Sequence, residues 1–302
     1  MKALVDLATV AREPRDRIAE YRIAASIPPA ACTCFRGLEI YWNWSRLVGY
    51  AEPQPSLEAL GEFYRNEYRQ VMGKRTGLDH YRSSPNYRAQ ARSQVGWVRE
   101  HIGPKGQWLD VGAGYGLLAS EVRETLPEWQ VAALEADVAT HSTLHELGRL
   151  LSDEGAFWDP GQPPVGSFDV ISLSHVLEHL RDPWAALCRC REHLHPGGLM
   201  MVEVPNDDLA ELVRSDRSSD LPHLWFFSES GLVGLARDCG FEVLRQGAVG
   251  LHTVRPREGL MRRALRWGRI RLHGALVLLD DPDWYAEAEG RRDVRVLLRR
   301  AP

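Results

Sequence analysis

The stretch "LDVGAGYG", residues 109–116, decides the fold of this chain. The stretch begins with an apolar run, and its last two residues open the amphipathic pattern "YGLLASEVRETLP", residues 115–127. Gly112, Gly114 and Gly116 give the spacing G-x-G-x-G. A glycine-rich turn between a strand and a helix lets the backbone approach a ligand closely. The stretch therefore predicts a strand, a ligand-binding turn and a helix of an α/β protein.

Apolar runs alternate with helical patterns on both sides of this turn, from about residue 105 to residue 246. The runs are "QWLDVGA", "QVAALEA", "FDVISLSH", "LMMVEVP" and "FEVLRQG", and "DVRVLLRR" near the C-terminus alternates like one more strand. Apolar runs separated by amphipathic helices indicate βαβ units. We expect a Rossmann-like, doubly wound, mostly parallel sheet of seven strands.

Composition excludes several classes of protein. The chain has 302 residues, 44% of them hydrophobic and 26% charged, with a formal net charge of −4. That balance does not suit a general nucleic-acid binder, and no apolar run is long enough to span a membrane. The N-terminus lacks the apolar core of a secretory signal, and five cysteines make no disulfide framework. We expect a cytoplasmic protein without a nucleic-acid or membrane partner.

Two carboxylates next to the glycine turn describe the ligand. Asp110 precedes the turn, where it would repel a pyrophosphate and attract a cation or an amine. Glu135 follows Gly116 by 19 residues and ends the next apolar run, where a carboxylate can accept both ribose hydroxyl hydrogen bonds. Leu117 stands where a nicotinamide fingerprint needs glycine. The implied ligand has a ribose and an amine or cation, and no pyrophosphate.

Four motifs occur along the chain in the same order as in a known family. They are "WLDVGAGYGLLASEV", "AALEAD", "FDVISLSHVLEHLRDPWAAL" and "HPGGLMMVEVPN". From about residue 95 to residue 246 the chain resembles class I S-adenosylmethionine-dependent methyltransferases of the small-molecule type. The resemblance implies S-adenosylmethionine as cofactor. The cofactor residues that it implies are Asp110, Gly112, Ala113, Gly114, Gly116, Glu135, Ala136, Phe157, Trp158, Ser174 and His175.

The resemblance also assigns parts to these residues. The glycine turn would lie under the methionine part of the cofactor, Asp110 would orient its amino group and Glu135 would hold the ribose. Phe157 and Trp158 would lie near the adenine. Ser174 and His175, at the end of a strand, would touch the cofactor or the acceptor.

Further residues are candidates for the acceptor side. His223 in "HLWFFS" is a candidate general base, since an imidazole can take a proton near neutral pH, and His175 is a second catalytic candidate. His223 can instead only cap or pack. The substrate-binding candidates are Tyr64, Tyr81, Asn206, Trp225 and Phe226, of which Trp225 and Phe226 can equally fill the core.

The segment "SHVLEHLRDP", residues 174–183, contains H-x-x-E-H, which also marks a class of zinc peptidase. In a helical turn that spacing places both imidazoles on one side. The family resemblance explains far more of the chain, so we expect no metal. Glu178 and His179 then have either a site role or a packing role at a helix start. Cys32 and Cys34 are too few for a structural zinc site.

These observations give one domain organisation and one preferred function. Residues 1–100 are expected to form a helical cap on the acceptor side, 101–250 the cofactor-binding core, and 251–302 a helical insertion and the final strand. The expected activity is methyl transfer to a small molecule such as a secondary metabolite, most simply to oxygen. Transfer of the 3-amino-3-carboxypropyl group and a non-catalytic, cofactor-binding regulatory subunit are the alternatives. A homodimer is possible.

Overall fold

The computed structural model describes residues 15–20, 39–68, 77–151, 157–158, 166–207, 223–250 and 293–301. The helical insertion predicted within residues 251–290 lies outside these ranges, as do Cys32 and Cys34. Among the described helices, none combines the length and apolar character needed to cross a bilayer.

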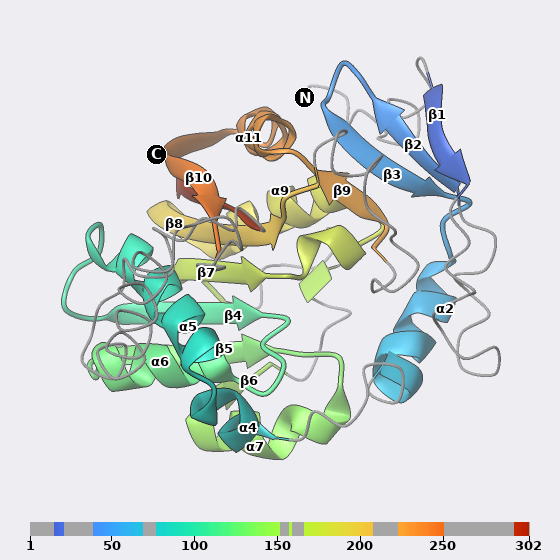
Figure 1. Cartoon of the computed structure of the whole chain (residues 1–302). Helices are drawn as coiled ribbons and strands as arrows, with labels where there is room; N and C mark the ends of the chain where they lie inside the picture. The colour runs from blue at the N-terminus through green and yellow to red at the C-terminus, as the bar shows by residue number, and fades with distance from the viewer. Residues whose placement is uncertain are drawn as a thin grey trace, which may run out of the picture.

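A seven-stranded sheet forms the centre of the molecule (Figure 1). Its strands lie in the order β10 (Phe241–Val249), β11 (Asp293–Arg300), β8 (Leu194–Pro205), β7 (Phe168–Ser174), β4 (Gly106–Val111), β5 (Trp129–Leu134) and β6 (Arg149–Leu150). The strands from β8 to β6 are parallel, and β11 is antiparallel to both of its neighbours. The predicted Rossmann-like, mostly parallel sheet is confirmed.

Helices cover both faces of this sheet because alternate side chains of each strand point to opposite faces. On one face, Trp108 and Val170 pack against α5 (Pro85–Arg99) and α6 (Leu117–Thr125). On the other, Leu109 and Ile171 belong to the cluster that includes α9 (Pro183–His193) and α11 (Glu229–Asp238). The shorter elements between β5 and β6 are η3 (Val138–Thr140) and α7 (His141–Leu147).

The N-terminal region contains strands, which the sequence analysis did not predict, as well as helices. A second sheet has the order β1 (Arg15–Glu20), β2 (Glu39–Asn43), β3 (Val48–Glu52) and β9 (Trp225–Phe227). The stretch "YWNWSRLVGY" folds into the β2–β3 hairpin, whose turn is closed by a 2.9 Å hydrogen bond from Arg46 N to Asn43 Oδ1. The stretch lacks a β-branched run, so its pattern did not predict strands.

The helical part of the cap comprises α2 (Leu57–Glu62), the π-helical turn η2 (Phe63–Glu67) and α4 (Leu78–Ser83). Ser56 caps α2, because its Oγ accepts a 3.1 Å hydrogen bond from Ala59 N. Antiparallel pairing of β3 with β9 joins the cap to the segment that follows His223. This pairing brings the N-terminal region to the carboxyl-end edge of the main sheet.

A buried ion pair joins two strands of the main sheet. Glu203 on β8 and Arg295 on β11 are register partners, and Arg295 Nε donates to Glu203 Oε2. Both side chains are fully buried. Burial by itself would raise the pKa of Glu203, but the charge of Arg295, the nearby His175 and a hydrogen bond from Gln90 hold it at about 2. Glu203 is therefore anionic in the core.

Removing the cation from this pair should be strongly destabilising, because an uncompensated carboxylate would stay buried. We predict that Arg295→Met lowers the free energy of unfolding by about 3–5 kcal/mol in urea titrations at pH 7. Adding Glu203→Gln should recover part of the loss. The control is Arg299→Met, whose exposed partner Glu242 lies 3.3 Å away, with an expected change within about 1 kcal/mol. Equal losses in the two single variants would contradict this account.

Candidate functional site

A cavity of about 720 Å³ lies at the carboxyl ends of the central parallel strands. Most of the residues predicted from the sequence line it. These are Tyr64, Tyr81, Asp110, Gly112, Ala113, Gly114, Glu135, Ala136, Trp158, Ser174, His175 and His223. The volume is in the range of pockets that bind drug-sized ligands.

The glycine turn is held against β5 and leaves its outer side open to the cavity. The backbone N–H groups of Gly112 and Ala113 donate to Leu134 O at 2.7 and 3.2 Å. Gly112 has a φ of +66°, and a Cβ on it would lie 2.4 Å from Val176 Cγ2. A side chain at Gly112 would therefore be both strained and blocked. Gly116 differs from the other predicted glycines, because it begins α6 and packs against Leu147 instead of lining the cavity.

Asp110 places a carboxyl group beneath the turn. Its Oδ1 accepts a 2.7 Å hydrogen bond from Ser172 Oγ, which in turn accepts a 2.9 Å bond from Trp108 Nε1. Burial raises the pKa of Asp110 to about 7, against the opposing effect of the Ser172 hydrogen bond, and the charge of Glu135 adds to the rise. A cationic ligand in the cavity would favour the ionised form.

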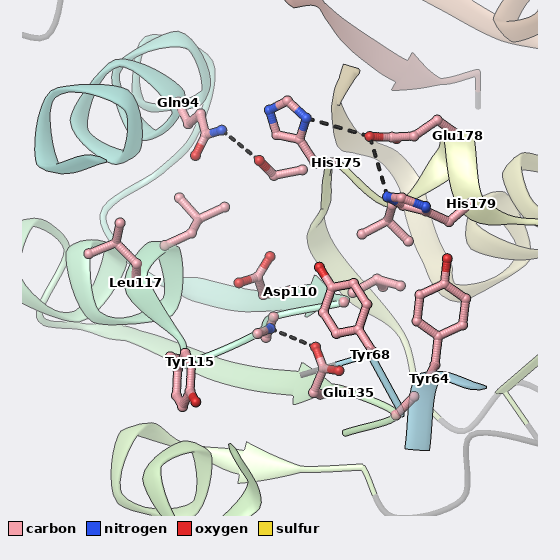
Figure 2. A pocket seen from close by; sticks show the side chains of 18 of the residues that line it. Tyr64, Tyr68, Gln94, Asp110, Tyr115, Leu117, Glu135, His175, Glu178 and His179 are labelled. Atoms are coloured by element: carbon pink, nitrogen blue, oxygen red, sulfur yellow. Dashed lines mark hydrogen bonds and ion pairs between the residues drawn. The ribbon is translucent and has the colours of Figure 1, made fainter. Parts of the chain in front are cut away.

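Glu135 follows the end of β5 and lies beside the glycine turn (Figure 2). Its Oε2 accepts a 2.6 Å hydrogen bond from Gly114 N, and its Oε1 a 2.9 Å bond from Asp137 N. The carboxylate is thereby held at the mouth of the glycine turn. Asp110, Glu135 and the open backbone of the turn suit a ligand that carries an amino group and ribose hydroxyls, as the sequence predicts.

His175 follows β7 in a left-handed conformation, with a φ of 55°. Its backbone N–H donates to Glu203 O at 2.8 Å. Its ring nitrogens lie 3.5 Å from Glu178, 3.7 Å from Glu203 and 3.8 Å from Asp293. Burial would lower the pKa of His175, but these carboxylates raise it well above its usual value. The imidazole is then protonated at neutral pH, which suits charge stabilisation better than proton abstraction.

The H-x-x-E-H segment does not form the helical turn that its spacing suggests. His175 lies outside any helix, η4 (Leu177–His179) is a single 3-10 turn, and α9 begins only after its cap residue Asp182. Glu178 and His179 nevertheless point into the cavity (Figure 2). Burial would raise the pKa of Glu178, but His175 and the other nearby imidazoles hold it at about 2. These positions support the site role rather than packing alone.

Besides Gly116, four predicted residues lie away from the cavity wall. Phe157 is fully buried and stacks on His193, with ring centroids 4.3 Å apart. Trp225 and Phe226 are buried in β9, where pairing with β3 holds them in the core. Asn206 forms an isolated β-bridge with Phe227 of β9. The structure thus favours the core alternative for the two residues of β9.

Helix α5 supplies cavity residues that the sequence analysis did not single out. Gln94 Nε2 donates to Ser174 Oγ at 2.8 Å, and Gln90 Nε2 donates to Glu203 Oε1 at 2.5 Å. The two amides share one face because they are four residues apart on a helix. The signal available in the sequence was two glutamines four residues apart in "AQARSQ", residues 89–94. Tyr68, Tyr87 and Tyr115 complete an aromatic lining.

The raised pKa of Asp110 predicts a pH-dependent stability of the unliganded protein. The carboxyl group ionises near pH 3.8 in the unfolded chain and near pH 7 in the fold. The unfolded state therefore loses its proton first, and stability falls as the pH rises between these values. Asp110→Asn should raise Tm over wild type, by scanning calorimetry, more at pH 8 than at pH 5. Asp79→Asn, on an exposed helix position, is the control. An equal gain for Asp110→Asn at both pH values would contradict the assignment.

Part of this chain is similar to known proteins. Residues 84–246 match the family model described as "Methyltransferase domain". A tRNA U34 carboxymethyltransferase of Shewanella baltica is 29% identical over 51% of this chain and 50% of its own length. A ubiquinone biosynthesis O-methyltransferase of Xanthomonas axonopodis pv. citri is 30% identical over 36% of this chain and 48% of its own. The chain thus spans about half the length of these curated relatives.

One solved structure resembles the chain over most of its length. It is the plantazolicin methyltransferase BpumL in complex with SAH, with a TM-score of 0.52 and 13% sequence identity. The match covers 80% of this chain and 94% of that one. At this identity the likeness concerns the fold.

Proposed function

Because the chain belongs to the class I S-adenosylmethionine-dependent methyltransferase family, we propose that it methylates an oxygen atom of a small-molecule acceptor. The observation that carries the proposal is one continuous cavity with two chemically different ends. At one end lie the glycine turn, Asp110 and Glu135. At the other lie Tyr64, His179 and His223.

The first end suits the cofactor, S-adenosylmethionine, which supplies a methyl group already activated by the positive sulfur. Asp110 is placed to hold the amino group, and Glu135 is placed to accept hydrogen bonds from the ribose hydroxyls. The glycine turn lets the backbone approach the methionine part. Burial of the Asp110 carboxyl favours a cationic partner over a neutral one.

The second end suits a flat, uncharged acceptor with a hydroxyl group. Tyr64 and Tyr68 form its aromatic wall, with ring centroids 5.4 Å apart. Among the described residues that line the cavity, none is Lys or Arg. Phosphate-rich nucleic acids are held chiefly by such cations. The lining therefore favours a small molecule over the tRNA acceptor that the Shewanella relative's name implies for that protein.

The chemistry asks the protein to align the acceptor oxygen with the methyl group and to keep water out. A hydroxyl acceptor must also lose its proton. His179 and His223 are the imidazoles nearest each other at this end of the cavity, with ring centroids 4.9 Å apart. They are the groups placed to assist that loss. The cytoplasmic location and the homodimer stay predictions.

The proposal is tested by incubating the full chain with S-adenosylmethionine and separate pools of phenols, aliphatic alcohols, amines and tRNA. Mass spectrometry should show one added methyl group, resistant to mild hydrolysis, on a hydroxyl-bearing small molecule. An added aminocarboxypropyl group would instead support that alternative. Methylation of tRNA alone would overturn the small-molecule assignment, and cofactor binding without any product across the pools would support the regulatory-subunit alternative.

Removal of the His223 imidazole should slow transfer strongly, because we propose that it assists the loss of the acceptor proton. We predict that His223→Ala lowers kcat/KM by about 100-fold or more with an acceptor found in that screen. His145→Ala, which alters an exposed imidazole on α7, should leave the rate unchanged. If His223→Ala kept the wild-type rate from pH 6 to pH 9, His223 would have no part in the reaction.

A further inference from the structure

Three potential metal ligands converge at the acceptor end of the cavity. Glu178, His179 and His223 each place one ligand atom within 4.8 Å of those of the other two. Glu178 Oε1 lies 3.8 Å from His179 Nε2, and the two imidazoles pack edge to face. All three residues line the cavity. Figure 2 shows Glu178 and His179 on the side of the cavity opposite Glu135.

The backbone brings these ligands together from distant parts of the chain. Glu178 and His179 belong to η4, whereas His223 precedes β9. A 2.8 Å hydrogen bond from Leu224 N to Glu178 O joins the two segments directly beside the cluster. The pairing of β9 with β3 holds the second segment from its other side. The cluster is therefore built on fixed backbone and not on free surface side chains.

Glu178 gives the second, independent indication of a cation. Its side chain is 1% exposed. Within the part of the chain that the structure describes, neither carboxylate oxygen receives a hydrogen bond of ordinary length. The nearest ring nitrogens are 3.5 and 3.8 Å away. His175 supplies a paired charge at 3.5 Å, but among the described residues no close donor occupies the lone pairs of the two oxygens, and a metal ion would use them.

We propose that Glu178, His179 and His223 bind one divalent first-row transition-metal ion. This inference rests on the proposed function, because the ion would bind the acceptor oxygen at the acceptor end of the cavity. Two imidazoles and one carboxylate suit zinc, iron, cobalt or manganese better than magnesium or calcium, which prefer oxygen ligands alone. Three protein ligands leave coordination positions open for an acceptor oxygen.

A neighbouring cluster competes less well for an ion. His175, Glu203 and Asp293 also lie within 4.8 Å of one another. However, both oxygens of Glu203 already accept hydrogen bonds, one from Arg295 and one from Gln90. An ion there would have to displace a buried guanidinium. His175 instead lies with Nδ1 beside Glu178, where it orients that carboxylate as an outer-shell partner.

The ion gives the acceptor end the positive charge that no described Lys or Arg of its lining supplies. An acceptor hydroxyl that coordinates to the ion has a lowered pKa and passes its proton to solvent. The oxygen lone pair then forms the new bond to the methyl carbon. The bond between that carbon and sulfur breaks, and its electron pair stays on sulfur, which becomes neutral. His223 is then a ligand, and the ion, rather than the imidazole, promotes the loss of the proton.

Cobalt binding to the full chain tests the metal site without any acceptor. Protein treated with a chelator and dialysed is titrated anaerobically with Co²⁺, whose visible absorption reports the ligand geometry. We expect one ion per chain, with affinity at least about tenfold weaker in Glu178→Gln and in His223→Ala. His145→Ala should bind as wild type. Circular dichroism and Tm identify any variant that fails to fold, and Glu178→Gln keeps the size of the native side chain.

Two outcomes overturn the inference: no Co²⁺ binding by the wild-type chain, or equal binding by the wild type and both ligand variants. S-adenosylmethionine binding is measured on the same samples. If the cofactor binds to all of them while Co²⁺ binding fails, the metal inference is wrong and the proposed function survives. If the wild-type chain binds Co²⁺ but not the cofactor, the proposed function fails instead.

Discussion

The site depends on the parallel pairing of β4 with β5 on one side and with β7 on the other. The chain leaves the carboxyl ends of β4 and β7 toward opposite faces of the sheet, since α6 and α9 cover opposite faces. This divergence opens a crevice at the switch point of the strand order, where ligands of open α/β sheets bind. Asp110, Glu135 and His175 lie at that edge because each belongs to, or directly follows, the end of a neighbouring strand.

Three acidic side chains are buried at this same edge of the sheet. Asp110, Glu178 and Glu203 are each at most 3% exposed, and each is handled differently. Glu203 is neutralised within the fold by Arg295. Among the described residues, Asp110 has the neutral hydroxyl of Ser172 as a donor and Glu135 as a repelling charge, so its ionised form suits a cationic ligand. Glu178 has imidazoles at longer distances, which suits a metal ion. Where the described residues leave a buried carboxylate short of close hydrogen bonds, a bound ligand or ion can supply the missing contacts.

Much of the core could be predicted from the sequence because its signals are local. The run ending in Asp110, the glycine turn and Glu135 lie within a single βαβ unit, so spacing alone indicates their proximity. The small sheet could not be predicted in this way. Strand β3 has its partners in β2 and β9, and the second of these is far away in the chain. From the sequence, Trp225 and Phe226 could therefore be either pocket residues or core residues, and the pairing with β3 favours the core.

The H-x-x-E-H segment shows a different limit. Its letters suggest helical spacing, yet the left-handed backbone of His175 removes that residue from the turn. The third candidate ligand, His223, comes from a segment that only tertiary structure brings beside Glu178. The sequence analysis predicted no metal because the family resemblance explained far more of the chain than a zinc motif did. The cluster in the structure uses two residues of the motif and one from outside it.

The most direct test of the account is calorimetric titration of the purified full chain with S-adenosylmethionine and with S-adenosylhomocysteine, alongside Glu135→Ala. The account predicts one site per chain for each ligand, with dissociation constants of about 1–100 μM, within the range of enzyme–substrate affinities. Glu135→Ala should weaken both by about tenfold or more, because the ribose hydroxyls lose a charged acceptor. Absence of binding to the folded wild-type chain, or equal binding by the variant, would contradict the cofactor site.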